Sequence, residues 1–300
     1  MEKSAEMQPL NHLLNDPPAL RQRADEDGFL FFRSLVPADP ILSLRRQFLQ
    51  VCDKHGWIAP GTALIDGIAD PSADEIEPVQ ASGVSMAGYQ DVQRLEAFHQ
   101  LSHHPAIIGM LETLFGETVF AHPRNIGRLM IPAKCNVPTP PHQDYIYIQG
   151  TKSFYSLWMP LGNCPRQLGG LATLQGSHKL GILPTRPSAG AGGQAVILDG
   201  IEQEWFEADF EIGDVLFFHN QTVHKSLPNL TDNQIRLSVD YRYQPASQPI
   251  VQGSVRPHGD VLTWEEVYED WDSTELRYYW KDYEMSIEPF DGALAERQTG

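Results

Sequence analysis

The spacing of apolar positions changes twice along the chain and divides it into three regions. From about residue 16 to 115 apolar residues recur at helical spacing. From about 118 to 245 short β-branched and aromatic runs alternate with turn residues, a pattern typical of a double-sheet jelly roll. Helical spacing returns over about 246–300. We therefore predict a mainly β chain with flanking helices (α+β), built as a single domain of residues 1–300 around a double-stranded β-helix (jelly-roll) core.

Local signals place several elements in the first region. Asp16 and Pro17 are suited to begin a helix that ends at Gly28, and the run 29–32 reads as a strand. A second helix is expected from Asp39 to about His55. These helices should buttress a sheet.

Several segments outside the predicted strands are candidates for covering a site. Residues 58–91 read as a long loop, and 94–115 as helix broken by Pro105. The stretch 184–193, rich in glycine and alanine, is expected to be a mobile loop near the mouth of the site.

The C-terminal region carries a capping signal and an aromatic tail. Thr263 with Glu266 forms the pattern of a capping box at the start of a helix over 262–271. The aromatic residues of the tail 276–283 are most simply core, and the alternatives are closure over the substrate or the contact of a homodimer.

Charge and cysteine content restrict the partners and the compartment. A net charge of −17, from 39 acidic and 22 basic residues, disfavours nucleic acids and anionic membranes as partners. No stretch approaches the roughly 20 apolar residues of a membrane-spanning helix. The three cysteines, Cys52, Cys135 and Cys164, show neither disulfide nor zinc spacing, so we expect a reduced, cytoplasmic protein.

The segment around His142-Gln143-Asp144 is the strongest candidate for chemistry. In an extended strand, residues 142 and 144 point to the same side. The prolines that precede them and the residues 145–148, which are β-branched and aromatic, favour a strand. Two metal ligands would then arrive together.

A third ligand must come from elsewhere, and His219 and His224 compete for this role. We favour His224, because Arg236 follows it by 12 residues inside an apolar, strand-like segment. A buried guanidinium is costly unless a carboxylate meets it. Arg242 has the same strand parity as Arg236 and stays an alternative.

Two histidines and one carboxylate leave the remaining positions of a redox iron open. A nearby arginine suits 2-oxoglutarate, whose keto-acid end would chelate the metal while the distal carboxylate binds Arg236. Ser226, two residues after His224, would lie on the same face of a strand and could donate a second hydrogen bond to that carboxylate.

Five blocks of this sequence resemble, in order, the phytanoyl-CoA dioxygenase family of Fe(II)/2-oxoglutarate oxygenases. They are His142-Gln143-Asp144, Ser156–Leu161, Gly169–His178, Gly213-Asp214 and His224–Arg236. The resemblance spans roughly residues 20 to 245. It implies that His142, Asp144 and His224 bind Fe(II), that 2-oxoglutarate and O2 are cosubstrates, and that Trp158 lies beside 2-oxoglutarate.

The presence of Asp144 narrows the expected reaction. Halogenating relatives are known to lack this carboxylate, so the resemblance implies hydroxylation, desaturation or ring formation. We expect a small-molecule substrate, such as a natural-product intermediate, rather than an acyl-CoA, because no local cluster of Lys and Arg is visible for the phosphates. The alternatives are a metal-dependent hydrolase, which leaves Arg236 unexplained, and a catalytically silent ligand-binding member of the fold.

Overall fold

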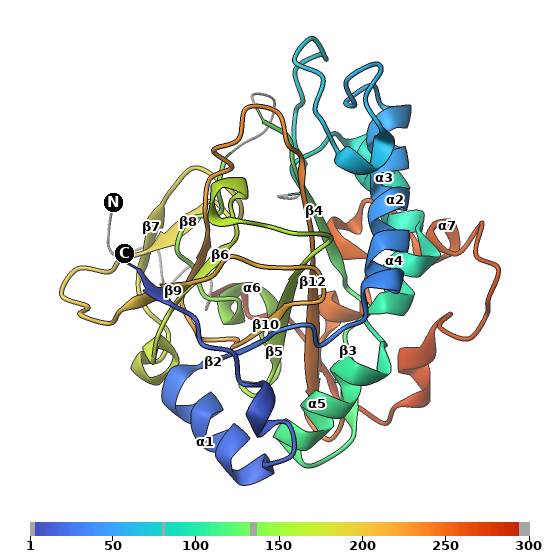
Figure 1. Cartoon of the computed structure of the whole chain (residues 1–300). Helices are drawn as coiled ribbons and strands as arrows, with labels where there is room; N and C mark the ends of the chain where they lie inside the picture. The colour runs from blue at the N-terminus through green and yellow to red at the C-terminus, as the bar shows by residue number, and fades with distance from the viewer. Residues whose placement is uncertain (1–3, 80–81, 133–136, 294–300) are drawn as a thin grey trace.

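The computed structural model describes residues 4–79, 82–132 and 137–293, and two β-sheets form its centre (Figure 1). Among these residues the larger sheet has six strands, with β4 beside β12 and the others in the order β2, β10, β5, β12, β3. Their bounds are β2 Phe29–Phe32, β3 Val119–Ala121, β4 Ile126–Met130, β5 Tyr155–Pro160, β10 Val215–His219 and β12 Arg236–Pro245.

The smaller sheet has four strands in the order β1, β9, β6, β11 among the described residues. Their bounds are β1 Ala5–Glu6, β6 Leu171–Leu174, β9 Trp205–Glu207 and β11 His224–Ser226. An isolated bridge from His142 to His224 adds the segment before residue 143 to the β11 edge. The paired sheets are the predicted jelly-roll core.

Helices cover the outer face of the larger sheet (Figure 1). They are α1 Pro17–Asp27, α2 Ala38–Lys54, α3 Met86–Arg94, α4 Glu96–Leu101 and α5 Pro105–Phe115. Two buried tyrosines of β12 fasten this layer: Tyr241 Oη donates to the carbonyl of Phe98 (2.7 Å) and Tyr243 Oη to that of Ser102 (2.8 Å). These two hydrogen bonds hold the helical layer against the sheet.

Strand β12 is buried on both faces, and its two faces differ in chemistry. Apolar and aromatic side chains of β12 pack against the helices. The alternate positions, on the opposite face of the strand, carry buried polar groups; they are Arg236, Ser238, Asp240, Arg242 and Gln244. Because five buried polar residues on one face of a strand need partners, this face marks where a ligand site can lie.

The capping signals read from the sequence are confirmed at three helix ends. Asp16 accepts a hydrogen bond from the Ala19 amide (3.2 Å), and α1 ends at Gly28, whose φ is 76°. Thr263 and Glu266 form the expected capping box.

The C-terminal helix is shorter than predicted. Helix α7 covers Trp264–Val267 and does not reach Trp271. Trp271 instead turns toward α3 and donates its indole N–H to the carbonyl of Arg94 (3.0 Å). An anchored aromatic side chain therefore overrides the helical pattern.

The aromatic tail belongs to the core and does not close over a site. Tyr279, Trp280 and Tyr283 pack in one cluster with Phe120. Tyr279 Oη also donates to the carbonyl of Ala121 (2.6 Å).

Two expected loops contain some regular structure. The stretch 58–91 includes the short helix Leu64–Asp66 and ends inside α3, which begins at Met86. The stretch 184–193 contains β7 (Thr185–Pro187), which pairs with β8 (Gln194–Val196) as a hairpin. Cys135 lies outside the described residues, and no helix among those described is long and apolar enough to span a membrane.

Candidate functional site

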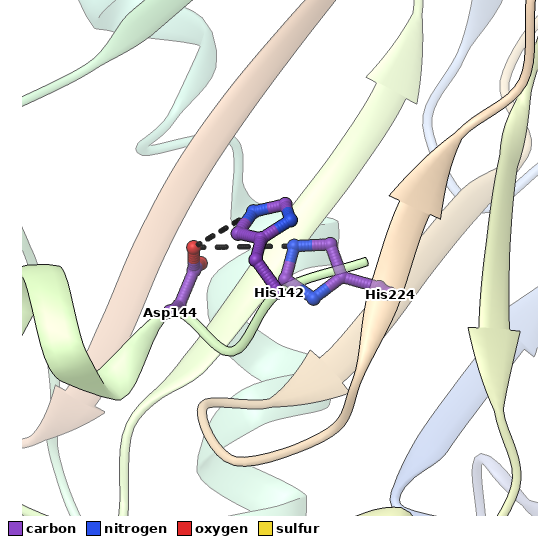
Figure 2. Close-up of side chains that lie close together, drawn as sticks. All are labelled: His142, Asp144 and His224. Carbon is purple, nitrogen blue, oxygen red and sulfur yellow. Dashed lines mark ion pairs between the residues drawn. The ribbon is translucent and has the colours of Figure 1, made fainter. Parts of the chain in front are cut away.

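His142, Asp144 and His224 point toward one another between the two sheets (Figure 2). The Nε2 atom of His142 lies 3.8 Å from Asp144 Oδ1, and that of His224 lies 3.9 Å from the same oxygen. One ligand atom from each residue lies within 4.8 Å of the other two, and all three residues are buried. Three converging donors of this kind could hold a divalent metal ion.

The predicted strand over residues 145–148 is wrong. These residues form the short helix α6, Tyr145–Ile148, and Asp144 at its start has helical φ and ψ of −64° and −30°. The amides of Tyr147 and Ile148 bond to the Asp144 carbonyl (3.0 and 3.1 Å). Asp144 therefore reaches His142 through a turn rather than through strand alternation.

Backbone contacts fix both imidazole rings. The Nδ1 of His142 donates to the carbonyl of Pro140 (2.8 Å), and the Nδ1 of His224 donates to that of Thr222 (3.0 Å). Burial, and after it the neighbouring His224, lowers the pKa of His142 to about 3. Both rings are thus neutral with their Nε2 lone pairs free, as metal ligation requires.

The two oxygens of Asp144 have different surroundings. Oδ2 accepts a hydrogen bond from Ser156 Oγ and lies 3.5 Å from Arg242 Nη2. Burial would raise the pKa of Asp144, but Arg242 and the two histidines outweigh burial and hold the pKa below its usual range. The carboxylate is ionised, and Oδ1 is the oxygen that faces the histidines.

His219 does not join this group. Its Nδ1 accepts a hydrogen bond from the Gln221 amide (3.2 Å), and its ring packs against Tyr155 and His178. The structure brings His224, and not His219, to the other two candidates.

Arg236 is buried, with 2% of its surface exposed, and has no ion pair with any described residue. Its Nη1 donates to Ser238 Oγ (2.7 Å), its Nη2 lies 4.0 Å from Met130 Sδ, and its Nε has no partner. A desolvated guanidinium without a carboxylate is costly. An anion that binds at Arg236 would therefore stabilise its buried charge.

Two cavities meet beside these residues. The metal cavity lies against the His142, Asp144 and His224 side chains. The outer cavity, of about 350 Å³, extends past Arg236. Their linings share Arg128, Thr139 and Ser226.

Ser226 and Trp158 both line the metal cavity. Ser226 ends β11, two residues after His224, and lines both cavities. Trp158 lines the metal cavity, and the Arg236 guanidinium carbon lies 6.0 Å from the centroid of its ring.

Sequence reasoning missed two contacts inside the site. Ser156 of β5 donates a hydrogen bond to Asp144, and Arg128 of β4 pairs with Asp240 of β12. Ser156 shares the strand parity of Trp158, which could have signalled that it faces inward. The Arg128–Asp240 pair depends on the register of two strands about 110 residues apart, so no local signal reveals it.

The sequence matches the profile of the phytanoyl-CoA dioxygenase (PhyH) family over residues 24–238. A 1-deoxypentalenic acid 11-beta-hydroxylase from Streptomyces arenae is 33% identical over 248 residues, which cover 78% of this chain and 83% of that protein. The peroxisomal phytanoyl-CoA dioxygenase of Homo sapiens is 27% identical over 228 residues, covering 72% of this chain and 66% of that protein.

Solved structures with a similar fold come from nogalamycin biosynthesis. The epimerase SnoN, in complex with Fe3+, alpha ketoglutarate and nogalamycin RO, has a TM-score of 0.55 at 21% identity and covers 78% of this chain and 87% of that one. The non-heme alpha ketoglutarate dependent carbocyclase SnoK has a TM-score of 0.53 at 18% identity, with 83% and 89% covered. These similarities show the shared fold.

Proposed function

Because the chain belongs to the phytanoyl-CoA dioxygenase family of Fe(II)/2-oxoglutarate-dependent oxygenases, we propose that it hydroxylates an unactivated C–H bond of a small molecule. The observation that carries this proposal is the pairing of a buried His/Asp/His group with an unpaired, buried arginine in adjoining cavities.

In this proposal His142, Asp144 and His224 hold Fe(II), and Arg236 binds the distal carboxylate of 2-oxoglutarate. The residues fit these groups. The free Nε2 atoms and Asp144 Oδ1 offer three donors to one ion, and a planar carboxylate would supply the partner that Arg236 lacks. Ser226 would add a hydrogen bond to that carboxylate, and the ring of Trp158 would lie beside the cosubstrate.

The bound iron and 2-oxoglutarate supply the oxidation, in which O2 converts C–H to C–OH while 2-oxoglutarate becomes succinate and CO2. The chain supplies position and exclusion of water. Ser156 and Arg242 fix the carboxylate of Asp144, and backbone carbonyls fix the two histidine rings. All three ligands are buried, so the reacting centre is shielded from bulk solvent.

The named activity of the relatives supports a small-molecule substrate. The Streptomyces arenae relative is a hydroxylase of 1-deoxypentalenic acid, a small organic acid. We propose a substrate of this general kind for the present chain.

A metal-dependent hydrolase would need a general base near the metal in addition to the ligands. Asp240 is the other carboxylate that lines the metal cavity, and it is paired with Arg128. The unpaired Arg236 would also have no role in hydrolysis. These features favour the oxygenase.

The test is O2-dependent release of succinate from 2-oxoglutarate, measured with Fe(II) over a panel of small carboxylic acids that begins with 1-deoxypentalenic acid. We expect succinate to form together with a product heavier by one oxygen atom, and His142→Ala to abolish both. Succinate formation that continues without O2, or in the His142→Ala variant, would contradict the proposal.

A further inference from the structure

The outer cavity extends beyond the part next to Arg236, where the distal carboxylate of 2-oxoglutarate would bind. Its volume of about 350 Å³ falls within the range of roughly 300–1,000 Å³ found for small-molecule pockets. Its lining comes from β4, β11 and β12, from a loop before α3, from the segment before His142, and from the turn of the β7–β8 hairpin. The lining residues are Pro78, Ser82, Gly83, Arg128, Leu129, Met130, Val137, Thr139, Ala189, Gly190, Ala191, Gly192, Ser226 and Arg236.

The chemistry of this lining selects among substrates. Leu129, Met130, Pro78 and the alanines of the hairpin turn give the cavity an apolar wall. No described lining residue is acidic, and its charged side chains are Arg128 and Arg236. A chain of phosphates such as that of coenzyme A would need several cations, and the described lining offers two, one of which, Arg236, is assigned to 2-oxoglutarate.

The charges around both cavities do not balance. Three guanidinium groups, of Arg128, Arg236 and Arg242, face two carboxylates, of Asp144 and Asp240. Fe(II) and the dianion of 2-oxoglutarate cancel each other, so one positive charge would remain in a desolvated space. A substrate with a single negative charge would neutralise it.

We call the turn of the β7–β8 hairpin, residues 188–193, the glycine loop. Its glycines pack closely against residues 138–147, the segment that contains His142 and Asp144. A Cβ at Gly190 would lie 2.6 Å from the carbonyl oxygen of Pro138 and 3.0 Å from Pro140 Cδ. At Gly192 the same addition would lie 2.7 Å from Tyr147 Oη, which donates to the Gly192 carbonyl (3.4 Å). The absence of side chains at these positions allows the close approach.

Tyr147 connects the glycine loop with the metal ligands. Its amide bonds to the carbonyl of Asp144, and its ring lies edge-on to that of His142, with 6.3 Å between centroids. On the other side of the loop, the amide of Val196 in β8 bonds to the Pro141 carbonyl (2.7 Å). The hairpin therefore contacts the chain both before His142 and after Asp144.

We propose that the outer cavity is the substrate pocket, that the glycine loop is its specificity lid, and that the pocket takes a compact, apolar molecule with one carboxylate. This inference rests on the proposed function and names its substrate class. Ala189 and Ala191 of the lid contact the apolar body, and the carboxylate offsets the one positive charge that remains in the two joined cavities.

The substrate class is tested by calorimetry on the anaerobic enzyme loaded with Fe(II) and 2-oxoglutarate, using adamantane carboxylate, the neutral adamantane carboxamide and hexanoyl-CoA as probes. We expect the carboxylate to bind at least about tenfold more tightly than the other two, since a desolvated charge pair distinguishes it from them. Equal binding of acid and amide, tighter binding of hexanoyl-CoA, or binding of none of the three overturns the proposal.

The lid is tested with Gly190→Ala, for which Gly193→Ala is the matched control. Both residues have positive φ, of 99° and 66°, but a Cβ at Gly193 meets nothing within 4 Å. Gly190→Ala should weaken binding of adamantane carboxylate by about tenfold or more, and Gly193→Ala should not. Equal effects of the two variants overturn the lid.

The visible band of the Fe(II)–2-oxoglutarate complex is recorded in each variant. A normal band with the wrong probe preferences refutes this inference alone, whereas absence of the band in the unaltered protein refutes the proposed function.

Discussion

Arg236 and Arg242 lie on the same inward face of β12, and only Arg242 is within ion-pair distance of a carboxylate among the described residues. Its Nη2 lies 3.5 Å from Asp144 Oδ2, while Arg236 contacts Ser238 and Met130. Strand parity alone could not separate the two arginines. Their contacts therefore give the two arginines different roles. Arg242 orients the carboxylate of Asp144, a candidate metal ligand, and Arg236 can bind the carboxylate of a ligand.

Replacement of Arg236 by Gln should weaken binding of 2-oxoglutarate by roughly 10- to 100-fold, because a charge-assisted hydrogen bond contributes about 1.5–3 kcal/mol. The 2-oxoglutarate affinity of Arg236→Lys should lie between that of the unaltered protein and that of Arg236→Gln, because lysine keeps the charge and loses the planar fork of arginine. The dissociation constant is measured by anaerobic titration. Fe(II) affinity in the absence of 2-oxoglutarate is the control and should not change; unchanged 2-oxoglutarate binding would remove Arg236 from the site.

Ser156→Ala should weaken Fe(II) binding by about tenfold, because hydrogen-bond partners of ligating groups contribute 10- to 100-fold to metal affinity. The variant removes the hydroxyl that donates to Asp144 Oδ2. Ser102→Ala is the matched control, since its buried hydroxyl bonds the carbonyl of His99 away from the cavities. Equal Fe(II) affinity in both variants would show that Ser156 does not position the carboxylate.

His224→Gln should lose bound Fe(II), and His219→Gln should retain it. His224 Nε2 faces Asp144 Oδ1, whereas His219 packs against Tyr155 and His178. Metal content after equilibration with Fe(II) under anaerobic conditions distinguishes the variants. Loss of iron from the folded His219→Gln variant with retention in His224→Gln would reverse the assignment.

The sequence was sufficient for the elements whose signals are local. Asp16, Gly28 and the Thr263–Glu266 pair mark helix ends through groups only a few residues apart. The alternation of β12 likewise follows from its own residues. Such features need no knowledge of distant contacts.

The backbone conformation at Asp144 could not be predicted from such local signals. The aromatic and β-branched residues 145–148 favour a strand, yet they form α6, in which Ile146 and Ile148 are buried. The Tyr145 amide bonds to the carbonyl of Asn220, a contact that spans 75 positions. Tertiary contacts of this kind override local propensity. The hydrogen bond from Ser156 to Asp144 likewise depends on the tertiary structure and could not be predicted from local sequence.

Several buried histidines should make the fold sensitive to acid. Burial lowers the pKa of His99 to about 4 and that of His122 to about 3, against about 6.5 in the unfolded chain. The unfolded state therefore takes up protons first as pH falls. Their contribution to stability is complete above pH 6.5 and is lost progressively toward pH 4, by on the order of 1.4 kcal/mol per pH unit for each group.

Urea unfolding between about pH 7.5 and pH 5 measures this loss. The His99→Gln variant, which removes one such group, should show a shallower decline of the unfolding free energy below pH 6.5 than the unaltered protein. An identical decline in both proteins would mean that His99 does not contribute to the pH dependence.

The central claim is that His142, Asp144 and His224 hold an iron to which 2-oxoglutarate binds, and anaerobic absorption spectroscopy tests it most directly. Fe(II) and 2-oxoglutarate together should give a weak visible charge-transfer band that is absent with Zn(II), and that His142→Ala and Asp144→Ala both abolish. Absence of the band from the unaltered protein, or an undiminished band in either variant, would contradict the account.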